Sequence, residues 1–172
     1  LLAWDAVSAD ARKALEEQCE RFTGQLSDAM LDESTDFAIR RRIPRILARA
    51  GTQRAAYSLA AALNDPRFEV RFHAGRALEY LRRRKPELDF NGERVLAVID
   101  KELSVSRGIW ANHRILDTRD ESEQFLFLDD LLKERANQSL EHIFSLLALV
   151  LDWEPLKIAF RGLHAEDRVF RG

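Results

Sequence analysis

Residues 36–50 read DFAIRRRIPRILARA, and residues 67–81 read RFEVRFHAGRALEYL. The two stretches are offset by 31 residues and carry apolar or small side chains at matching positions. These positions follow i, i+4, i+7, i+8 and i+11, a spacing that forms one stripe along an α-helix. A helical unit that recurs in this way, and cannot bury its stripe alone, indicates stacked helices. The sequence therefore predicts an all-α fold, with antiparallel helix pairs stacked into a right-handed α-solenoid.

The composition agrees with this prediction and reveals an uneven distribution of charge. The chain is 46% hydrophobic and 33% charged, with seven glycines and four prolines, which suits a helix-rich domain. From Phe37 to Pro86 there are thirteen basic and three acidic residues, whereas the remainder carries 14 basic and 26 acidic residues. The net charge of −2 therefore conceals a basic zone between acidic ends.

We expect residues 1–172 to form one solenoid fragment. The predicted helix-pair units are 8–33, 36–63, 66–103 and 122–163, with an irregular helical insertion at 104–121 and a truncated next unit at 165–172. Ser8 is the expected N-cap of the first helix. Pro44 should kink a helix over 36–50, and Gly51 should end it. The chain lacks an initiator Met and stops in what reads as a repeat turn, so we expect it to be a piece of a longer polypeptide.

Residues 65–78, DPRFEVRFHAGRAL, resemble a HEAT repeat. They carry the Asp-Pro, Val-Arg and helically spaced small residues and leucine that are usual in that family. The resemblance covers residues 36–103 well and 140–172 in part. HEAT repeats usually recur at about 40 residues, so the interval of 31 seen here is short.

A narrower resemblance lies in residues 139–147, SLEHIFSLL, and 156–163, LKIAFRGL. They are similar to solenoid regions appended to bacterial membrane proteins of the major-facilitator or nucleotide-translocase type. The resemblance implies a cytoplasmic regulatory module, tethered to the inner membrane through other parts of its parent chain. The sequence itself predicts no membrane span, because its most apolar run, 143–151, is far shorter than the roughly 20 residues that a bilayer requires.

The sequence contains no motif for catalysis, a cofactor or a metal, so we predict a protein that is not an enzyme. Its four histidines are at least 22 residues apart and match no ligand spacing. Cys19 is the only cysteine and lies on an apolar stripe, which favours a small buried side chain over a nucleophile. No glycine-rich phosphate loop occurs.

The arginines provide the best candidate site. Offsets of +3, +6 and +10 from Ile39 and Val70 fall on one helix face beside the core stripe. Stacking the two helices should align six residues into a basic, partly aromatic ridge: Arg42, Arg45, Arg49, His73, Arg76 and Tyr80. Such a ridge could bind acidic peptides, anionic lipid headgroups or nucleic-acid phosphates. The structural alternative is that these arginines cover the edge of the core and pair with nearby acidic residues.

Two further groups of residues have predicted roles. Arginines at equivalent repeat positions suggest a structural ladder with turn aspartates; the residues are Arg40, Arg71 and Arg171, with Asp36, Asp65 and Asp167. A secondary candidate site is formed by Trp110, His113 and Arg114, which an inserted amphipathic helix could present to a partner.

The function predicted from these observations is a non-catalytic protein-interaction or scaffold module. A protein partner or an acidic peptide is the expected ligand, and an anionic membrane surface is reachable through the parent chain. One alternative is a nucleic-acid-binding HEAT-like domain that uses the arginine ridge. The other is an enzyme subunit similar to bilin lyases, which also contain short HEAT-type units.

Overall fold

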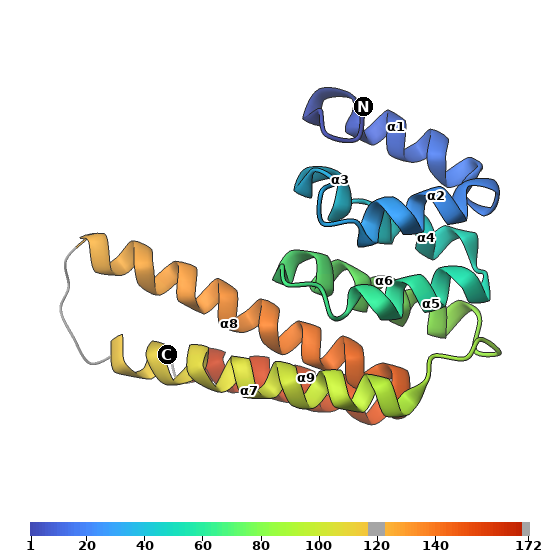
Figure 1. The fold of residues 1–172 in the computed structure, drawn as a ribbon. Helices are drawn as coiled ribbons and strands as arrows, with labels where there is room; N and C mark the ends of the chain where they lie inside the picture. The colour runs from blue at the N-terminus through green and yellow to red at the C-terminus, as the bar shows by residue number, and fades with distance from the viewer. Residues whose placement is uncertain (117–122, 170–172) are drawn as a thin grey trace. The chain divides into compact units, whose positions relative to one another are not determined.

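The computed structural model describes the backbone of residues 1–116 and 123–169 and the side chains of residues 1–108 and 130–162 (Figure 1). Within these ranges every regular element is an α-helix, as the sequence predicts. The helices are α1 (Asp5–Glu17), α2 (Cys19–Leu31), α3 (Phe37–Arg40), α4 (Ile43–Ala50), α5 (Gln53–Ala62), α6 (Phe68–Arg84), α7 (Gly92–Leu116), α8 (Glu123–Val150) and α9 (Trp153–Val169). Among the described residues, no helix is both long enough and apolar enough to cross a bilayer.

The chain divides into two compact units, Leu1–Val95 and Leu96–Gly172. Helix α7 belongs to both units, because it begins at Gly92 and continues to Leu116. The predicted boundary between a unit ending at 103 and an insertion beginning at 104 therefore falls inside one continuous helix. No proline stands at this boundary, and the Ser104 hydroxyl donates to the Asp100 carbonyl four residues earlier, so it is used within the helix instead of capping a new one.

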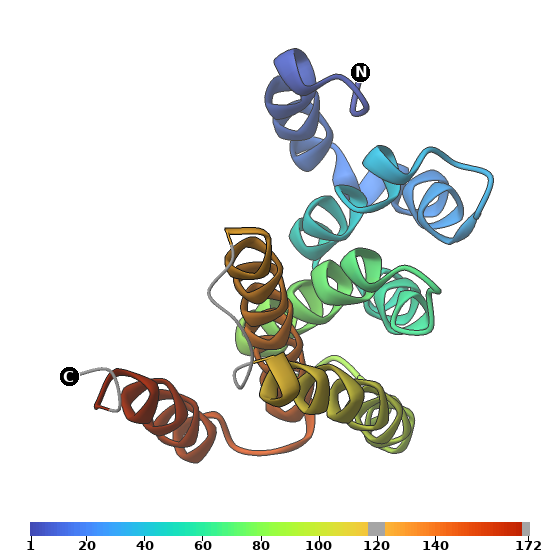
Figure 2. The ribbon, with the colours of Figure 1, turned by 90° about the vertical axis from the view of Figure 1, so that its left-hand side faces the viewer.

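The first unit consists of two layers of helices. Helix α4 packs against α1 and α6 in one layer, and α2 packs against α5 in the other (Figure 2). Both layers contribute to a core of fully buried aliphatic side chains, which includes Ile46 and Leu47 of α4, Leu59 of α5 and Leu78 of α6. Burial of each such side chain contributes about 1.5–3 kcal/mol, so the apolar stripes account for much of the unit's cohesion.

The first helix does not start after Ser8, as the sequence predicted. The chain is already helical at Asp5, and the Ser8 hydroxyl donates to the Asp5 carbonyl from within α1 instead of capping it. At Gln18 the backbone leaves the helical conformation, with φ −117° and ψ 14°, and α2 begins at the next residue. Helix α1 contains no buried residue, whereas Cys19 and Leu26 of α2 reach the core. The apolar stripe on which Cys19 was predicted to lie is thus interrupted at Gln18, between the two helices.

The first arginine-rich segment is broken rather than kinked. Asp36 accepts a hydrogen bond from the Ala38 N–H and caps α3, which ends at Arg40. Helix α4 then begins at Ile43, with Pro44 in its first turn. Proline is tolerated there because first-turn N–H groups have no helical acceptor, so the chain restarts the helix around Pro44 instead of bending it. Gly51 ends α4 with φ +60°, the left-handed conformation expected of a glycine C-cap.

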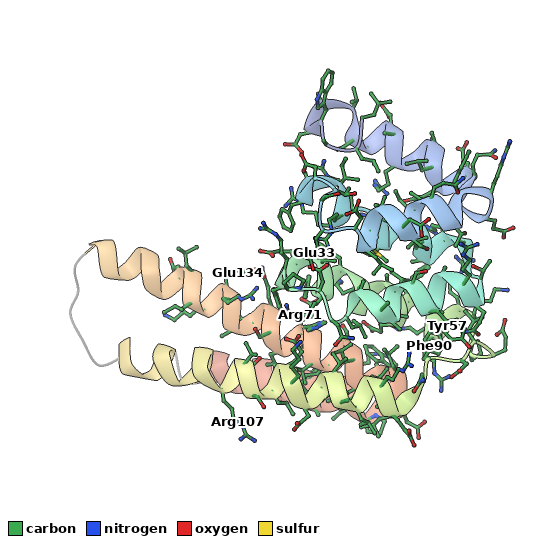
Figure 3. All side chains as sticks on the ribbon, in the orientation of Figure 1. Glu33, Tyr57, Arg71, Phe90, Arg107 and Glu134 are labelled. Atoms are coloured by element: carbon green, nitrogen blue, oxygen red, sulfur yellow. The ribbon has the colours of Figure 1, made fainter. Side chains whose placement is uncertain are left out.

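In the second unit, α8 is one continuous helix from Glu123 to Val150, and α9 extends beyond the predicted unit end at 163. The rings of Phe144 and Phe160 join α8 to α9 with their centroids 5.0 Å apart. His142 of α8 and Glu102 of α7 are both buried, with His142 Nε2 lying 4.0 Å from Glu102 Oε1. Arg107 projects from α7 into solvent (Figure 3).

Candidate anion-binding groove

The first unit contains a groove of about 640 Å³ lined by residues of α1, α4 and α6 and of the α3–α4 connection. All six residues of the predicted ridge line it: Arg42, Arg45, Arg49, His73, Arg76 and Tyr80. Ser8, Arg12 and Arg41 complete its polar lining, and Ala48 and Ala77 provide small apolar surfaces. The structure therefore brings the six predicted residues together, although Arg42 and Tyr80 are 38 positions apart in the sequence.

Helical spacing explains why the predicted residues meet. Steps of three and four residues return to the same face of a helix, so Arg45 and Arg49 of α4 share one face, as do His73, Arg76 and Tyr80 of α6. Because α4 and α6 pack against each other, these two faces border the same groove. Ala48 and Ala77 have short side chains, which leaves space between the longer arginines.

Positive charge dominates the lining. Six of the lining residues are arginines and none is acidic. Among the carboxylates near the groove, Glu16 of α1 accepts a hydrogen bond from Arg12 at 2.7 Å and lies 3.8 Å from the Arg49 guanidinium. Asp5 pairs with Arg42, which also donates to the Leu2 carbonyl. Two arginines of the ridge, Arg42 and Arg49, thus lie beside acidic residues, as the structural alternative predicted.

Arg45 remains available to a ligand. Its side chain is exposed, and no acidic side chain in the described part of the chain forms an ion pair with it. Arg41 likewise makes no ion pair with a described side chain, although its guanidinium lies 5.6 Å from the Phe37 ring centroid. Two guanidinium groups without a carboxylate therefore border a groove that is already rich in positive charge.

Tyr80 is held by an arginine on each of the two helices. Its hydroxyl oxygen accepts one hydrogen bond from Arg49 Nη1 at 2.9 Å and another from Arg84 Nη1 at 2.6 Å. The same two guanidinium carbons lie 5.5 and 5.4 Å from the ring centroid, within the range of cation–π attraction. These contacts connect α4 to the C-terminal part of α6 and orient the Arg49 guanidinium at the edge of the groove.

The pKa of His73, which lines the groove, is lowered from its usual value. Neighbouring protein atoms remove water from the imidazole, and the positive charges of Arg76 and Arg41 add to this effect. Together they hold the pKa of His73 below its ordinary value of 6.5, while Glu69 acts weakly in the opposite direction. The imidazole also contacts the Phe72 ring edge-on, with centroids 5.5 Å apart. His73 is therefore largely neutral at pH 7 in the free protein.

The predicted arginine ladder is present at one described position. Arg40 and Asp65 form a buried ion pair, and Arg40 Nε donates to the Met30 carbonyl at 2.9 Å. Arg71, the equivalent residue 31 positions later, donates to the carbonyls of Asp65 and Pro66 at 2.9 and 3.1 Å. Asp36 serves as a helix cap instead. Arg171 and Asp167 lie outside the residues whose side chains are described.

The secondary candidate site cannot be assembled from the described side chains. Trp110, His113 and Arg114 fall within α7, but only the backbone of this part of the helix is described. Sequence reasoning missed Ser8, Arg12 and Arg41 of the groove. Ser8 and Arg12 are four residues apart on one helical face, a signal that could have identified α1 as a wall of the groove.

Within the described residues, no group of three or more His, Cys, Asp or Glu side chains is arranged to hold a metal ion. Comparison of the chain with known protein families, with curated proteins and with solved structures finds no match. The groove must therefore be interpreted from its own geometry and charge.

Proposed function

We propose that this chain is a non-catalytic interaction module that binds an acidic segment of a protein partner in the groove between α1, α4 and α6. The observation that carries the proposal is the convergence of six arginines on one concave surface without a carboxylate among the lining residues. Like charges brought together in this way repel one another, and an anionic ligand relieves that repulsion.

The side chains at the groove suit carboxylate recognition. A guanidinium presents a planar set of N–H donors that can bind a carboxylate through two parallel hydrogen bonds. Arg45 and Arg41 make no ion pair with any described side chain, so a ligand need not displace an internal partner from them. Arg42 and Arg49 already contact Asp5 and Glu16, and these contacts illustrate the kind of acidic group that the groove accepts.

Protein is a better candidate than single-stranded nucleic acid as the source of the acidic ligand. Sequence-independent binding of single strands relies on aromatic faces on which bases stack. Tyr80 is the aromatic residue of the groove lining, and two guanidinium groups already lie against its ring. The aliphatic surfaces of Ala48 and Ala77 can instead accommodate small side chains of a peptide.

We also propose that the first unit is a HEAT-like stack of helix pairs. The repeated sequence supports this proposal, because Arg40 and Arg71 occupy equivalent positions and both bind the turn at Asp65. Such a stack would hold the groove at a fixed width, since α4 and α6, which carry three of its six arginines, belong to successive pairs.

A binding experiment with a charge-reversal series tests the function. We expect a fluorescent peptide of eight glutamates to bind the full chain, and a glutamine peptide of equal length not to bind. Arg45→Glu should weaken binding about tenfold or more, because one hydrogen bond to a charged group contributes roughly 1.5–3 kcal/mol. Combining it with Arg49→Glu should abolish detectable binding while helicity is retained.

Arg21→Glu combined with Arg54→Glu is the matched control. Both residues are exposed on the α2–α5 layer and lie outside the groove lining, yet the change in net charge is the same. Equal weakening by the two double variants would show that net charge, not the groove, determines affinity. Tighter binding of single-stranded DNA, with a steep salt dependence, would assign the groove to nucleic acid instead.

A further inference from the structure

We propose that His73 takes up a proton when an acidic segment occupies the groove, so that acidification tightens binding. This inference rests on the proposed function, because it concerns regulation of the same groove. It adds a specific coupling between the ligand and the ionisation of one side chain.

The position of His73 supports the coupling. It is an exposed residue of α6 and lines the same groove as Arg45 of α4, Arg12 of α1 and Arg41 of the α3–α4 connection. On its own helix it is flanked by Arg76, three residues later, and by Glu69, four residues earlier. An anion bound among these arginines would therefore lie within electrostatic reach of the imidazole.

In the free protein, the charges facing His73 favour its neutral form. Arg76 on its own helix and Arg41 on the neighbouring segment both repel the imidazolium, and the removal of water from the ring acts in the same direction. Glu69 is the carboxylate that partly offsets them. The acidic groups that α1 brings near the groove, Asp5 and Glu16, pair with arginines.

A bound carboxylate reverses this balance. It neutralises the arginines that repel the imidazolium and adds a negative charge that attracts it, so the pKa of His73 rises in the complex. The extra affinity is fully present below the pKa of the free protein, where His73 is protonated before and after binding. It is lost as the pH rises through the pKa of the complex, above which His73 is neutral in both states. Ligand and proton thus strengthen each other's binding by the same factor.

The size of the effect follows from the shift. If binding raises the pKa of His73 by one unit, the peptide binds about ten times more tightly at low pH, where His73 is protonated, than at high pH, where it is neutral. Each further unit adds another factor of about ten. A shift of about one unit therefore predicts up to about tenfold tighter binding at pH 5.5 than at pH 8.

The test uses the full chain and the same eight-glutamate peptide, with the dissociation constant measured from pH 5.5 to pH 8. Glutamate is suitable because its carboxylates, with an ordinary pKa of about 4.3, remain ionised over this range, whereas a phosphate would itself titrate. We expect the His73→Gln variant to bind the peptide at every pH with the weaker affinity that the wild-type chain shows at pH 8. His73→Arg should bind tightly at every pH, and His164→Gln should keep the wild-type pH dependence.

A second measurement does not depend on a variant. The imidazole resonances of His73, followed by NMR in the wild-type chain, should report a higher pKa with the peptide than without it. An unchanged imidazole pKa, or a pH dependence that persists in His73→Gln, would overturn the coupling while leaving the groove as a binding site. Absence of peptide binding at any pH would overturn the proposed function and this inference together.

Discussion

Replacement of Asp65 by asparagine should destabilise the first unit severely. The side chains of Arg40 and Asp65 are only 3% and 4% exposed, so the ion pair between them is almost completely removed from water. Asparagine has nearly the same shape and can still accept the hydrogen bond that Asp65 Oδ1 receives from the Arg67 N–H at 2.9 Å. The substitution therefore removes the negative charge and leaves the local turn intact.

The expected loss is about 3–5 kcal/mol, the usual cost of leaving one member of a buried ion pair without its partner. Domains of this size have a total stability of roughly 5–15 kcal/mol, so the variant should lose a large fraction of it. The melting temperature of a unit this small should fall by about 10 °C or more. Arg40→Met in the same background should recover most of the loss, since no unpaired charge then remains buried. Recovery will be incomplete, because the Met30 carbonyl loses the donor that Arg40 Nε provides.

Urea unfolding of the full chain, followed by circular dichroism, measures these free energies. Hydrogen exchange of α4 and α6 amides assigns the loss to the first unit. Asp36→Asn is the matched control: Asp36 is exposed and caps α3, and asparagine caps helices equally well, so its cost should stay below about 0.5 kcal/mol. The reasoning fails if Asp65→Asn lowers the free energy of unfolding by less than about 1 kcal/mol. It also fails if the double variant loses the sum of the free energies that the two single variants lose, because the two side chains would then not be coupled.

Three further predictions concern individual positions. Gly24→Ala should stabilise the chain by about 0.5–1 kcal/mol in thermal melts, because alanine favours the interior of α2 and the new Cβ would meet only the flexible end of Arg54, 2.9 Å away. Gly51→Ala should instead destabilise the chain by about 1 kcal/mol, since the left-handed backbone at φ +60° disfavours any side chain. If both alanine substitutions changed the stability in the same direction, these two predictions would be wrong. Thr52→Ala should cost about 1 kcal/mol through loss of the N-cap of α5, measured by urea unfolding, and a neutral result would contradict the capping assignment. Burial raises the pKa of the Cys19 thiol, so a thiol reagent at pH 8 should label it far more slowly in the folded chain than in urea; equal rates would show that the thiol is accessible.

The sequence predicted the groove more accurately than it predicted the helix boundaries. The 31-residue repeat placed Arg42, Arg45 and Arg49 beside His73, Arg76 and Tyr80 because packing of α4 against α6 preserves the repeat register. The same repeat predicted that Arg40 would pair with a turn aspartate, and Asp65 is that partner. Features that depend on equivalent positions in neighbouring helices are therefore visible in the sequence.

Boundaries depended on local backbone conformations that side-chain periodicity does not reveal. The break at Gln18 interrupts an apolar pattern that reads as continuous. Pro44 indicated a disturbance of the first arginine-rich helix, but the apolar spacing did not show that the helix would end at Arg40 and begin again at Ile43. Ser8 has the chemistry of an N-cap, yet α1 begins three residues earlier, so its hydroxyl is used within the helix. In the second unit, α7 and α8 continue through positions where no strong terminating residue stands.

The break between α3 and α4 gives three identical neighbours different tolerances to substitution. Arg40 uses two different nitrogens of its guanidinium, Nη2 and Nε, to reach Asp65 and the Met30 carbonyl inside the core. Lysine has a single compact ammonium group and could not serve both acceptors, so Arg40→Lys should be poorly tolerated. Arg41 and Arg42 line the groove, and although Arg42 also reaches two acceptors, the Leu2 carbonyl and Asp5, its carboxylate partner is exposed to water, so lysine there retains the positive charge at a smaller cost. Along one run of three arginines, an exchange usually regarded as conservative is harmful at the first position and mild at the next two.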